Sequence, residues 1–256
     1  MTEADRTFRI FIGYDDRQAV AYTALQQSIL ETASCPVSIT PLMLHTLPIT
    51  RRGLTPFTYS RFLVPWLCDY EGFGLFLDAD MFLVSDIAEL YSNFNPDYAV
   101  SVVRSIAQFE QSSVLLFNNS HPSNRQLTPE FVEHTEQNLL GLEWAGPENI
   151  GELDAKWNQL VGYQECSDAS GNLHFTMGVP AFPETSTSPF IDQWTDCAKR
   201  SIGVTQSWTE IMGPSVHAIK IDDSFFPKYV WNQETQRLHN EHKQLVETLV
   251  NQNQIA

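Results

Sequence analysis

The sequence predicts an α/β fold with a mostly parallel central sheet flanked by helices. Short apolar runs of strand length alternate with segments whose apolar residues recur at helical spacing, a pattern typical of parallel sheets. The apolar run at residues 75–77 is followed directly by the acidic pair Asp78 and Asp80. Ligands of open α/β sheets bind beyond the carboxyl ends of the strands, so this position suits a binding site.

Each expected element follows from local composition. Residues 8–13 form an apolar run ending in a Gly turn, and residues 19–30 carry Ala21, Leu25 and Ile29 at helical spacing. Ser85 or Asp86 is expected to cap a helix over residues 85–90. The other expected strands cover residues 37–44, 74–81, 98–103 and 113–117, another helix covers 58–67, and 118–128 is a loop.

The composition restricts the class of partner. The chain has 256 residues, a formal net charge of -16 and an apolar content of 43%, which suits a globular protein. An acidic surface repels nucleic acid and anionic membranes, so we expect neither as a partner. No run approaches the roughly 20 apolar residues of a membrane span, and the first residues lack the features of a signal peptide. The four cysteines are widely spaced, as in a reducing compartment, so a cytoplasmic location is expected.

Asp78 and Asp80 are the strongest candidates for chemistry. Two carboxylates at the end of one strand repel each other unless a cation lies between them. Oxygen ligands of this kind select magnesium, manganese or calcium. An Asp-x-Asp pair is also common in solvated loops and helix caps, so the pair alone leaves both interpretations open.

Residues 74–90, with the sequence GLFLDADMFLVSDIAEL, resemble the Asp-x-Asp segment of family-eight glycosyltransferases. The resemblance implies a GT-A fold and the transfer of a sugar from a nucleotide-diphosphate donor with retention of anomeric configuration. It also implies that Asp78 and Asp80 bind manganese, or magnesium, which bridges the two phosphates of a UDP-sugar. Ala79 lies between them and would contact the donor. The acceptor would carry a hydroxyl group.

Two further segments match the family. The loop with Tyr14, Asp15 and Asp16 resembles its nucleotide-contacting loop, although Asp15 and Asp16 would otherwise be interpreted as an ordinary turn. The segment 58–62, TYSRF, resembles a family helix whose basic residue faces the donor, which assigns Arg61 to the diphosphate. Its planar fork suits a phosphate, and a surface salt bridge is the alternative.

A late histidine motif completes the resemblance. In residues 174–182, HFTMGVPAF, the resemblance makes His174 the third metal ligand. An imidazole beside two carboxylates suits manganese better than magnesium. Gly178 would let the backbone approach the diphosphate closely.

The chain departs from the family on the acceptor side. Gln111 stands where Asn is usual, and Ser113 replaces a Gly. We expect Gln111 to assist catalysis on the β-face of the sugar, in a front-face transfer without an enzymic nucleophile. The segment 150–158 resembles a later family segment, but the acceptor-side Asp-Gln pair that precedes it in the family has no counterpart.

The resemblance predicts one glycosyltransferase domain over residues 1–256. Residues 8–117 would form the nucleotide-sugar-binding core, 118–232 the acceptor-side part, and 233–256 a C-terminal helix or tail. Leu238, Leu245 and Leu249 suit either a helix packed on a partner, such as a second copy of the chain, or a solvated tail.

Two other functions fit the same residues. A non-catalytic nucleotide-sugar-binding protein is consistent with the departures at Gln111 and Ser113. A haloacid dehalogenase-type phosphatase also uses an Asp-x-Asp strand end, and residues 220–223, KIDD, resemble its later motif. Phe82 does not suit that family, and its nucleophile normally lies nearer the N-terminus.

Overall fold

The computed structural model describes residues 7–92, 94–104, 108–163, 166, 170–181, 185 and 187–201. These residues belong to a single compact unit that ends at Ser201. The expected C-terminal helix or tail at residues 233–256 and the segment 220–223 lie outside the described residues. Within the described part, no helix is long and apolar enough to cross a membrane.

The fold is built on a six-stranded sheet in the order β2-β1-β3-β6-β5-β7. The strands are β1 (Phe8–Gly13), β2 (Val37–Leu42), β3 (Phe73–Leu77), β5 (Val100–Val103), β6 (Val114–Asn118) and β7 (Ile150–Leu153). β1 pairs in parallel with β2 and β3, and β5 pairs in parallel with β7. Within this sheet, only β6 runs antiparallel to its neighbours, β3 and β5. The expected mostly parallel α/β sheet is therefore confirmed.

A second sheet has three strands in the order β4-β9-β8. They are β4 (Met81–Leu83), β8 (Gln159–Leu160) and β9 (Asn172–His174). β4 pairs antiparallel with β9, and β8 pairs in parallel with β9. This sheet brings the segment after Asp80 beside the segment that ends at His174.

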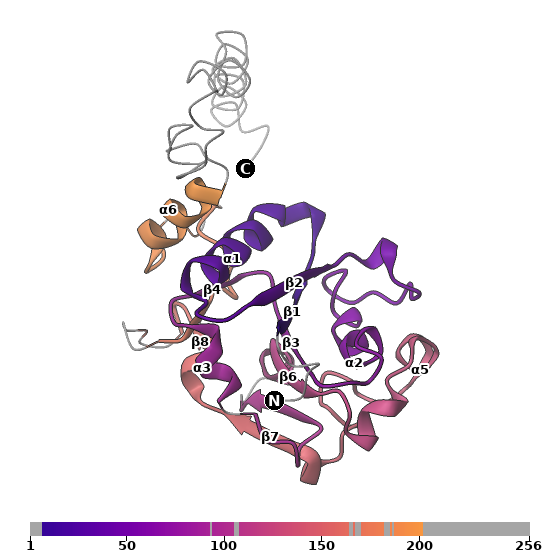
Figure 1. Cartoon of the computed structure of the whole chain (residues 1–256). Helices are drawn as coiled ribbons and strands as arrows, with labels where there is room; N and C mark the ends of the chain where they lie inside the picture. Colours follow the sequence, from indigo (N-terminus) through magenta and orange to yellow (C-terminus); the bar gives the residue numbers. More distant parts are fainter. Residues whose placement is uncertain are drawn as a thin grey trace, which may run out of the picture. The chain divides into compact units, whose positions relative to one another are not determined.

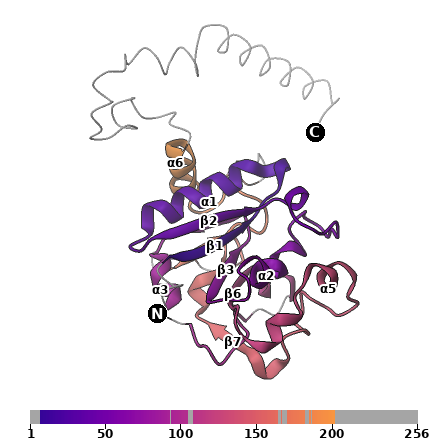
Figure 2. The same ribbon diagram turned by 45° about the vertical axis from the view of Figure 1, so that its right-hand side comes forward.

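Helices flank the large sheet (Figures 1 and 2). They are α1 (Ala19–Thr32), α2 (Val64–Leu67), α3 (Ile87–Tyr91), α4 (Gln108–Gln111), α5 (Pro129–His134) and α6 (Ile191–Ser201). In both views α1 runs beside β2 and β1, and it packs against α6. α2 packs on β3 and β6. All five residues of β3 are buried, as expected for a strand covered on both faces.

Several expected boundaries need correction. The strand expected over 74–81 ends at Leu77, and residues 81–83 join the second sheet as β4. The helix expected over 58–67 is a 3-10 turn at Ser60–Leu63 followed by α2, which has Pro65 in its first turn. Proline cannot donate the backbone hydrogen bond that a helix interior requires, but it is tolerated in the first turn. The α-helix therefore begins next to Pro65, at Val64. The predicted cap is confirmed at Asp86, whose side chain accepts a hydrogen bond from the Ala88 amide.

Candidate active site

The Asp78–Asp80 turn joins the two sheets. The amide of Asp78 donates to the carbonyl of Ser113, 3.1 Å away, and the carbonyl of Asp80 accepts from the amide of Phe175 at 2.9 Å. Ala79, between them, is buried. Because both ends of the turn are tied to neighbouring strands, the two carboxylates are held at the C-terminal end of β3, the edge where ligands of α/β sheets bind.

His174 meets these carboxylates through the second sheet. It ends β9 opposite Met81, the residue that follows Asp80. Its Nε2 lies 3.3 Å from Oδ1 of Asp80. One ligand atom from each of Asp78, Asp80 and His174 lies within 4.8 Å of the others, so these groups could hold a metal ion. The structure thus brings together the three residues that the family resemblance assigned to one metal centre.

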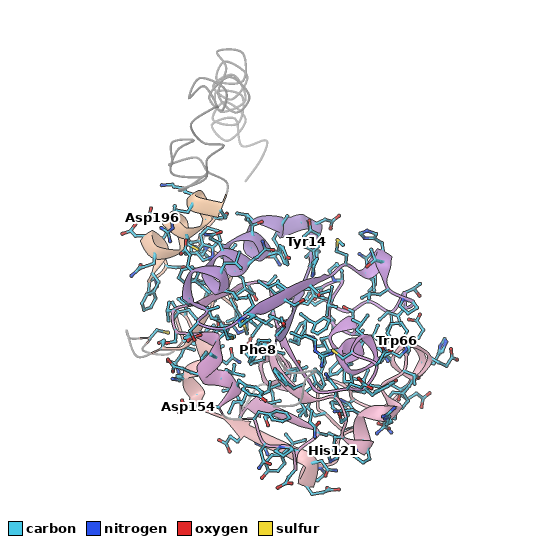
Figure 3. The ribbon with its side chains drawn as sticks, in the orientation of Figure 1. Phe8, Tyr14, Trp66, His121, Asp154 and Asp196 are labelled. Carbon is cyan, nitrogen blue, oxygen red and sulfur yellow. The ribbon has the colours of Figure 1, made fainter. Side chains whose placement is uncertain are left out.

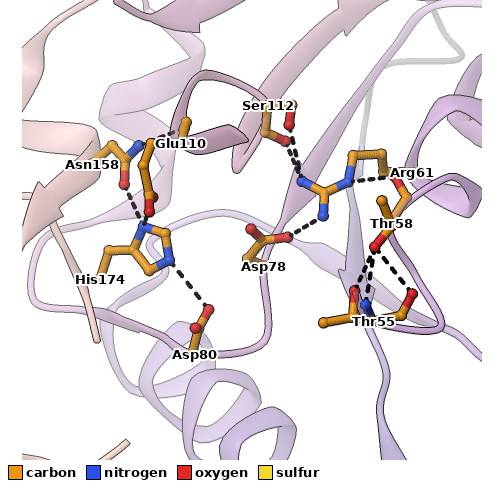
Figure 4. Close-up of polar contacts among 9 residues, drawn as sticks. All are labelled: Thr55, Thr58, Arg61, Asp78, Asp80, Glu110, Ser112, Asn158 and His174. Carbon is orange, nitrogen blue, oxygen red and sulfur yellow. Dashed lines mark hydrogen bonds and ion pairs between the residues drawn. The ribbon is translucent and has the colours of Figure 1, made fainter. Parts of the chain in front are cut away.

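Arg61 forms a buried ion pair with Asp78 (Figure 4). Its Nη2 lies 3.0 Å from Oδ1 of Asp78, and the two side chains are only 6% and 12% exposed. Its Nη1 donates to the carbonyl of Ser112 at 2.6 Å, and Nε donates to the carbonyl of Thr58 at 3.1 Å. Burial raises the pKa of Asp78, and the Arg61 guanidinium opposes that rise. Every nitrogen of the guanidinium therefore has a protein partner.

His174 is enclosed by acceptors on its other side as well. Its Nδ1 lies 2.8 Å from Oδ1 of Asn158 and 3.3 Å from Oε2 of Glu110. Burial alone would lower the pKa of His174, but the carboxylates of Asp80, Asp78 and Glu110 together raise it to about 8. The three carboxylates therefore favour the protonated imidazole when no metal ion is bound.

The loop after β1 lies at the same edge of the sheet. Tyr14 and Asp16 line a pocket of about 440 Å³ that also includes residues following β2, among them Leu44 and His45. Figure 3 marks the position of Tyr14, which is half-buried. Its ring meets that of Tyr22 edge to face, with ring centroids 5.5 Å apart. β2, β1 and β3 are parallel neighbours, so this pocket and the Asp78–Asp80 turn follow adjacent strand ends.

Asp15 is not among the residues that line that pocket. It is buried, and its Oδ1 accepts hydrogen bonds from the backbone amide and Nε of Arg17, at 3.0 and 2.9 Å. These hydrogen bonds hold the pKa of Asp15 below its ordinary value. Its carboxylate caps the 3-10 turn Asp16–Gln18. The interpretation of Asp15 as a turn residue therefore has direct support, and its contact with a donor stays a prediction.

Gly178 and Gln111 flank the same region. Gly178 adopts φ 116°, a conformation that favours glycine, and its amide donates to the Phe175 carbonyl to close the turn after His174. Gln111 is half-buried at the end of α4. Its neighbours in the chain, Glu110 and Ser112, contact His174 and Arg61 respectively.

No sequence motif assigns a role to Glu110, Asn158 or Thr176, although Glu110 and Asn158 contact His174 and Thr176 contacts Glu110. The Oγ1 of Thr176 donates to Oε1 of Glu110 at 2.7 Å, and Nδ2 of Asn158 donates to the Glu110 carbonyl at 3.0 Å. Asn158 ends the segment 150–158, which resembles a family segment, and this resemblance could have indicated that Asn158 belongs to the site. Glu110 lies in a segment where the chain departs from the family, and its sequence position carries no comparable signal.

The fold matches solved structures of GT-A glycosyltransferases. The bifunctional glycosyltransferase WbbM aligns with a TM-score of 0.60 and 14% identity over 76% of this chain and 50% of its own. GlyE from Streptococcus pneumoniae TIGR4 aligns with a TM-score of 0.57 and 14% identity over 75% of this chain and 60% of its own. The galactosyltransferase LgtC, solved with donor and acceptor sugar analogs, aligns with a TM-score of 0.52 and 13% identity, over 75% of this chain and 96% of its own. The chain thus spans only about half of WbbM and three fifths of GlyE. The protein has a GT-A-type fold with an Asp-Asp-His group at the C-terminal end of β3, the edge where α/β sheets bind ligands.

A sequence relative defines the family more narrowly. Protein CDI of Arabidopsis thaliana is 32% identical over 222 residues, which cover 74% of this chain and 85% of that protein. This chain belongs to the same family as protein CDI. No family model matches the sequence.

Proposed function

We propose that the chain is a metal-dependent glycosyltransferase that transfers a sugar from a UDP-sugar to a hydroxyl acceptor. The observation that carries this proposal is the convergence of Asp78, Asp80 and His174 at the carboxyl end of β3. The GT-A-type fold supports it, because its solved relatives are named as glycosyltransferases. Membership of family eight rests on the Asp-x-Asp and histidine motifs and is part of the proposal.

The three side chains fit a divalent ion. They offer two carboxylates and one imidazole, a set that suits manganese better than magnesium. Oδ1 of Asp78 is buried and accepts no hydrogen bond, although it lies within ion-pair distance of Arg61. A buried oxygen without a hydrogen bond is costly, and coordination to an ion removes that cost. When bound, the ion would act as a Lewis acid toward the diphosphate.

The pocket beside Tyr14 suits the nucleoside of the donor. Its volume of about 440 Å³ lies within the usual range for small-molecule sites. The aromatic face of Tyr14 would stack on the base, and Asp16 would accept hydrogen bonds from the ribose. The diphosphate would then reach from this pocket to Asp78 and Asp80, with Gly178 allowing a close backbone approach. Arg61 would lie beside the diphosphate and stabilise its negative charge.

We propose transfer with retention on the front face of the sugar. The bond between the anomeric carbon and the diphosphate oxygen breaks while the acceptor oxygen bonds to the same carbon from the same side. The acceptor proton passes to the departing diphosphate oxygen. Gln111 would stabilise the sugar on its opposite, β-face. This scheme uses no nucleophile from the protein.

The test measures UDP release and sugar transfer for a panel of UDP-sugars with manganese, with magnesium and with a chelator. We expect one donor to be hydrolysed slowly without acceptor, and the chelator to abolish this turnover. Asp80→Asn should lose turnover as well. Metal-independent turnover of the same donor, or full activity of Asp80→Asn, would refute the assignment.

A non-catalytic nucleotide-sugar-binding protein is the second candidate, favoured by Gln111 and Ser113 where the family has Asn and Gly. It predicts metal-dependent UDP binding with neither donor hydrolysis nor transfer. Hydrolysis of an aryl phosphate with magnesium would instead indicate the phosphatase. The same panel distinguishes all three outcomes.

A further inference from the structure

Nδ1 of His174 faces two buried acceptors on the side opposite Asp80 (Figure 4). Oδ1 of Asn158 lies 2.8 Å from it, and Oε2 of Glu110 lies 3.3 Å from it. All three side chains are buried, with relative exposures of 2%, 5% and 3% for His174, Asn158 and Glu110. Oε2 of Glu110 accepts no hydrogen bond. A buried oxygen without a hydrogen bond is costly, and the contact with Nδ1 of His174 is the interaction that can offset this cost.

The orientation of both acceptors is fixed by their other hydrogen bonds. Nδ2 of Asn158 donates to the Glu110 carbonyl at 3.0 Å, so the amide oxygen, and not the amide nitrogen, faces the ring. Oε1 of Glu110 accepts from Oγ1 of Thr176 at 2.7 Å, which directs Oε2 toward the imidazole. A carboxylate and an amide oxygen can only accept hydrogen bonds. Nε2 also faces an acceptor, Oδ1 of Asp80 at 3.3 Å, but Nδ1 has the nearer acceptor and a second one beside it. When the ring carries a single hydrogen, the geometry therefore favours Nδ1.

We infer that Glu110 and Asn158 are positioning residues that keep the proton of His174 on Nδ1 and leave Nε2 as the metal-binding nitrogen. Carboxylates and carbonyl oxygens commonly hold metal-bound histidines in this way, and they fix the tautomer, the ring orientation and the basicity of the ligand. The inference rests on the proposed metal centre. It adds that Glu110, a third carboxylate that does not itself bind the ion, strengthens the metal affinity of this centre through His174.

The first experiment measures Mn²⁺ binding to the full chain by calorimetry at one fixed pH. We expect Asn158→Leu, which has nearly the same volume but no acceptor, to raise the Kd about 10- to 100-fold. Glu110→Gln keeps the shape and removes the charge, so a rise of several-fold is expected. Asn158→Asp restores an acceptor for Nδ1 and should bind more tightly than Asn158→Leu. The control Glu152→Gln makes the same exchange at an exposed position of β7 and should bind as the wild type.

The second experiment needs no metal. Nitrogen-15 spectra of the metal-free chain at pH 10, with His174 identified by its loss in His174→Gln, report which ring nitrogen carries the hydrogen. We expect Nδ1–H in the wild type and a shift toward Nε2–H in Asn158→Leu. An Nε2–H tautomer in the wild type would overturn the inference, as would wild-type Mn²⁺ affinity in both Asn158→Leu and Glu110→Gln.

The proposed metal centre fails on a different result, namely unchanged Mn²⁺ binding in His174→Ala. The tautomer spectra remain decisive for Glu110 and Asn158 in that case, because they are recorded without metal. Unfolding curves of the metal-free variants identify any that does not fold. If Asn158→Leu does not fold, Glu110→Gln, which preserves shape, decides the affinity test, and wild-type Mn²⁺ affinity in that variant overturns the inference.

Discussion

The guanidinium of Arg61 and the carboxylate of Asp78 form an ion pair of 3.0 Å in the interior of the site. Arg61 is further held by the carbonyls of Thr58 and Ser112, and its guanidinium carbon lies 4.7 Å from the ring centroid of Phe76. A charge buried in this way is tolerated because it is paired with a carboxylate and the other two guanidinium nitrogens donate hydrogen bonds to backbone carbonyls. The pair therefore orients Asp78 before any ligand arrives.

Removing Arg61 should destabilise the protein strongly. Arg61→Gln leaves the carboxylate of Asp78 buried without its counter-charge, which typically costs about 3–5 kcal/mol. The free energy of unfolding in urea, without metal, measures this loss. Arg200→Gln is the matched control, because Arg200 pairs with Glu31 at the surface and such pairs contribute about 0–1 kcal/mol. Equal losses in the two variants would show that the buried pair has no special role.

The two aspartates should differ when each is changed to Asn. Asp80→Asn should weaken Mn²⁺ binding at least about 100-fold, because a charged ligand is lost. It should leave unfolding without metal less affected, since the Asp80 side chain is 23% exposed. Asp78→Asn should weaken Mn²⁺ binding equally and also destabilise the metal-free protein, because Arg61 then remains buried without its partner.

Calorimetry and urea unfolding on the same two samples test this contrast. Equal stability of the metal-free variants, or retained Mn²⁺ affinity in either, would contradict it.

The sequence predicts the centre of the site better than its surroundings. Asp78 and Asp80 follow an apolar strand, and β3 does end directly before Asp78. The break at Leu77 was missed because residues 75–83 stay apolar on both sides of the acidic pair, although they belong to two sheets. Glu110 and Asn158 were missed for a different reason. Their contact with His174 depends on how α4 and the 3-10 turn Ala155–Asn158 are placed by the tertiary fold.

The stability of the metal-free protein should fall as the pH rises through about 8. The pKa of His174 rises from 6.5 to about 8 in the folded state, so its protonated form stabilises the fold. This contribution is fully present below pH 6.5 and is lost as pH passes through 8. The shift corresponds to roughly 2 kcal/mol. Unfolding free energies between pH 6 and 9 in a chelator measure it, and His174→Gln should flatten this part of the profile.

Mn²⁺ binding should show the opposite trend, because the ion must displace the proton from the imidazole. Affinity should therefore increase between pH 6 and 8 and then level off. A flat affinity profile would show that His174 does not ligate the ion.

Tyr14 should determine nucleotide affinity without affecting the metal. It lines the pocket of about 440 Å³ beyond β1, while Asp78 and Asp80 follow β3 and His174 is the last residue of β9. Stacking of a base on an aromatic ring is worth about 1–3 kcal/mol, so Tyr14→Ala should weaken UDP binding about 5- to 150-fold. Tyr14→Phe keeps the ring and serves as the control, with nearly unchanged affinity. Calorimetric titration with UDP and, separately, with Mn²⁺ alone measures both effects. Loss of Mn²⁺ affinity in Tyr14→Ala, or unchanged UDP affinity, would show that the pocket beside Tyr14 does not hold the base.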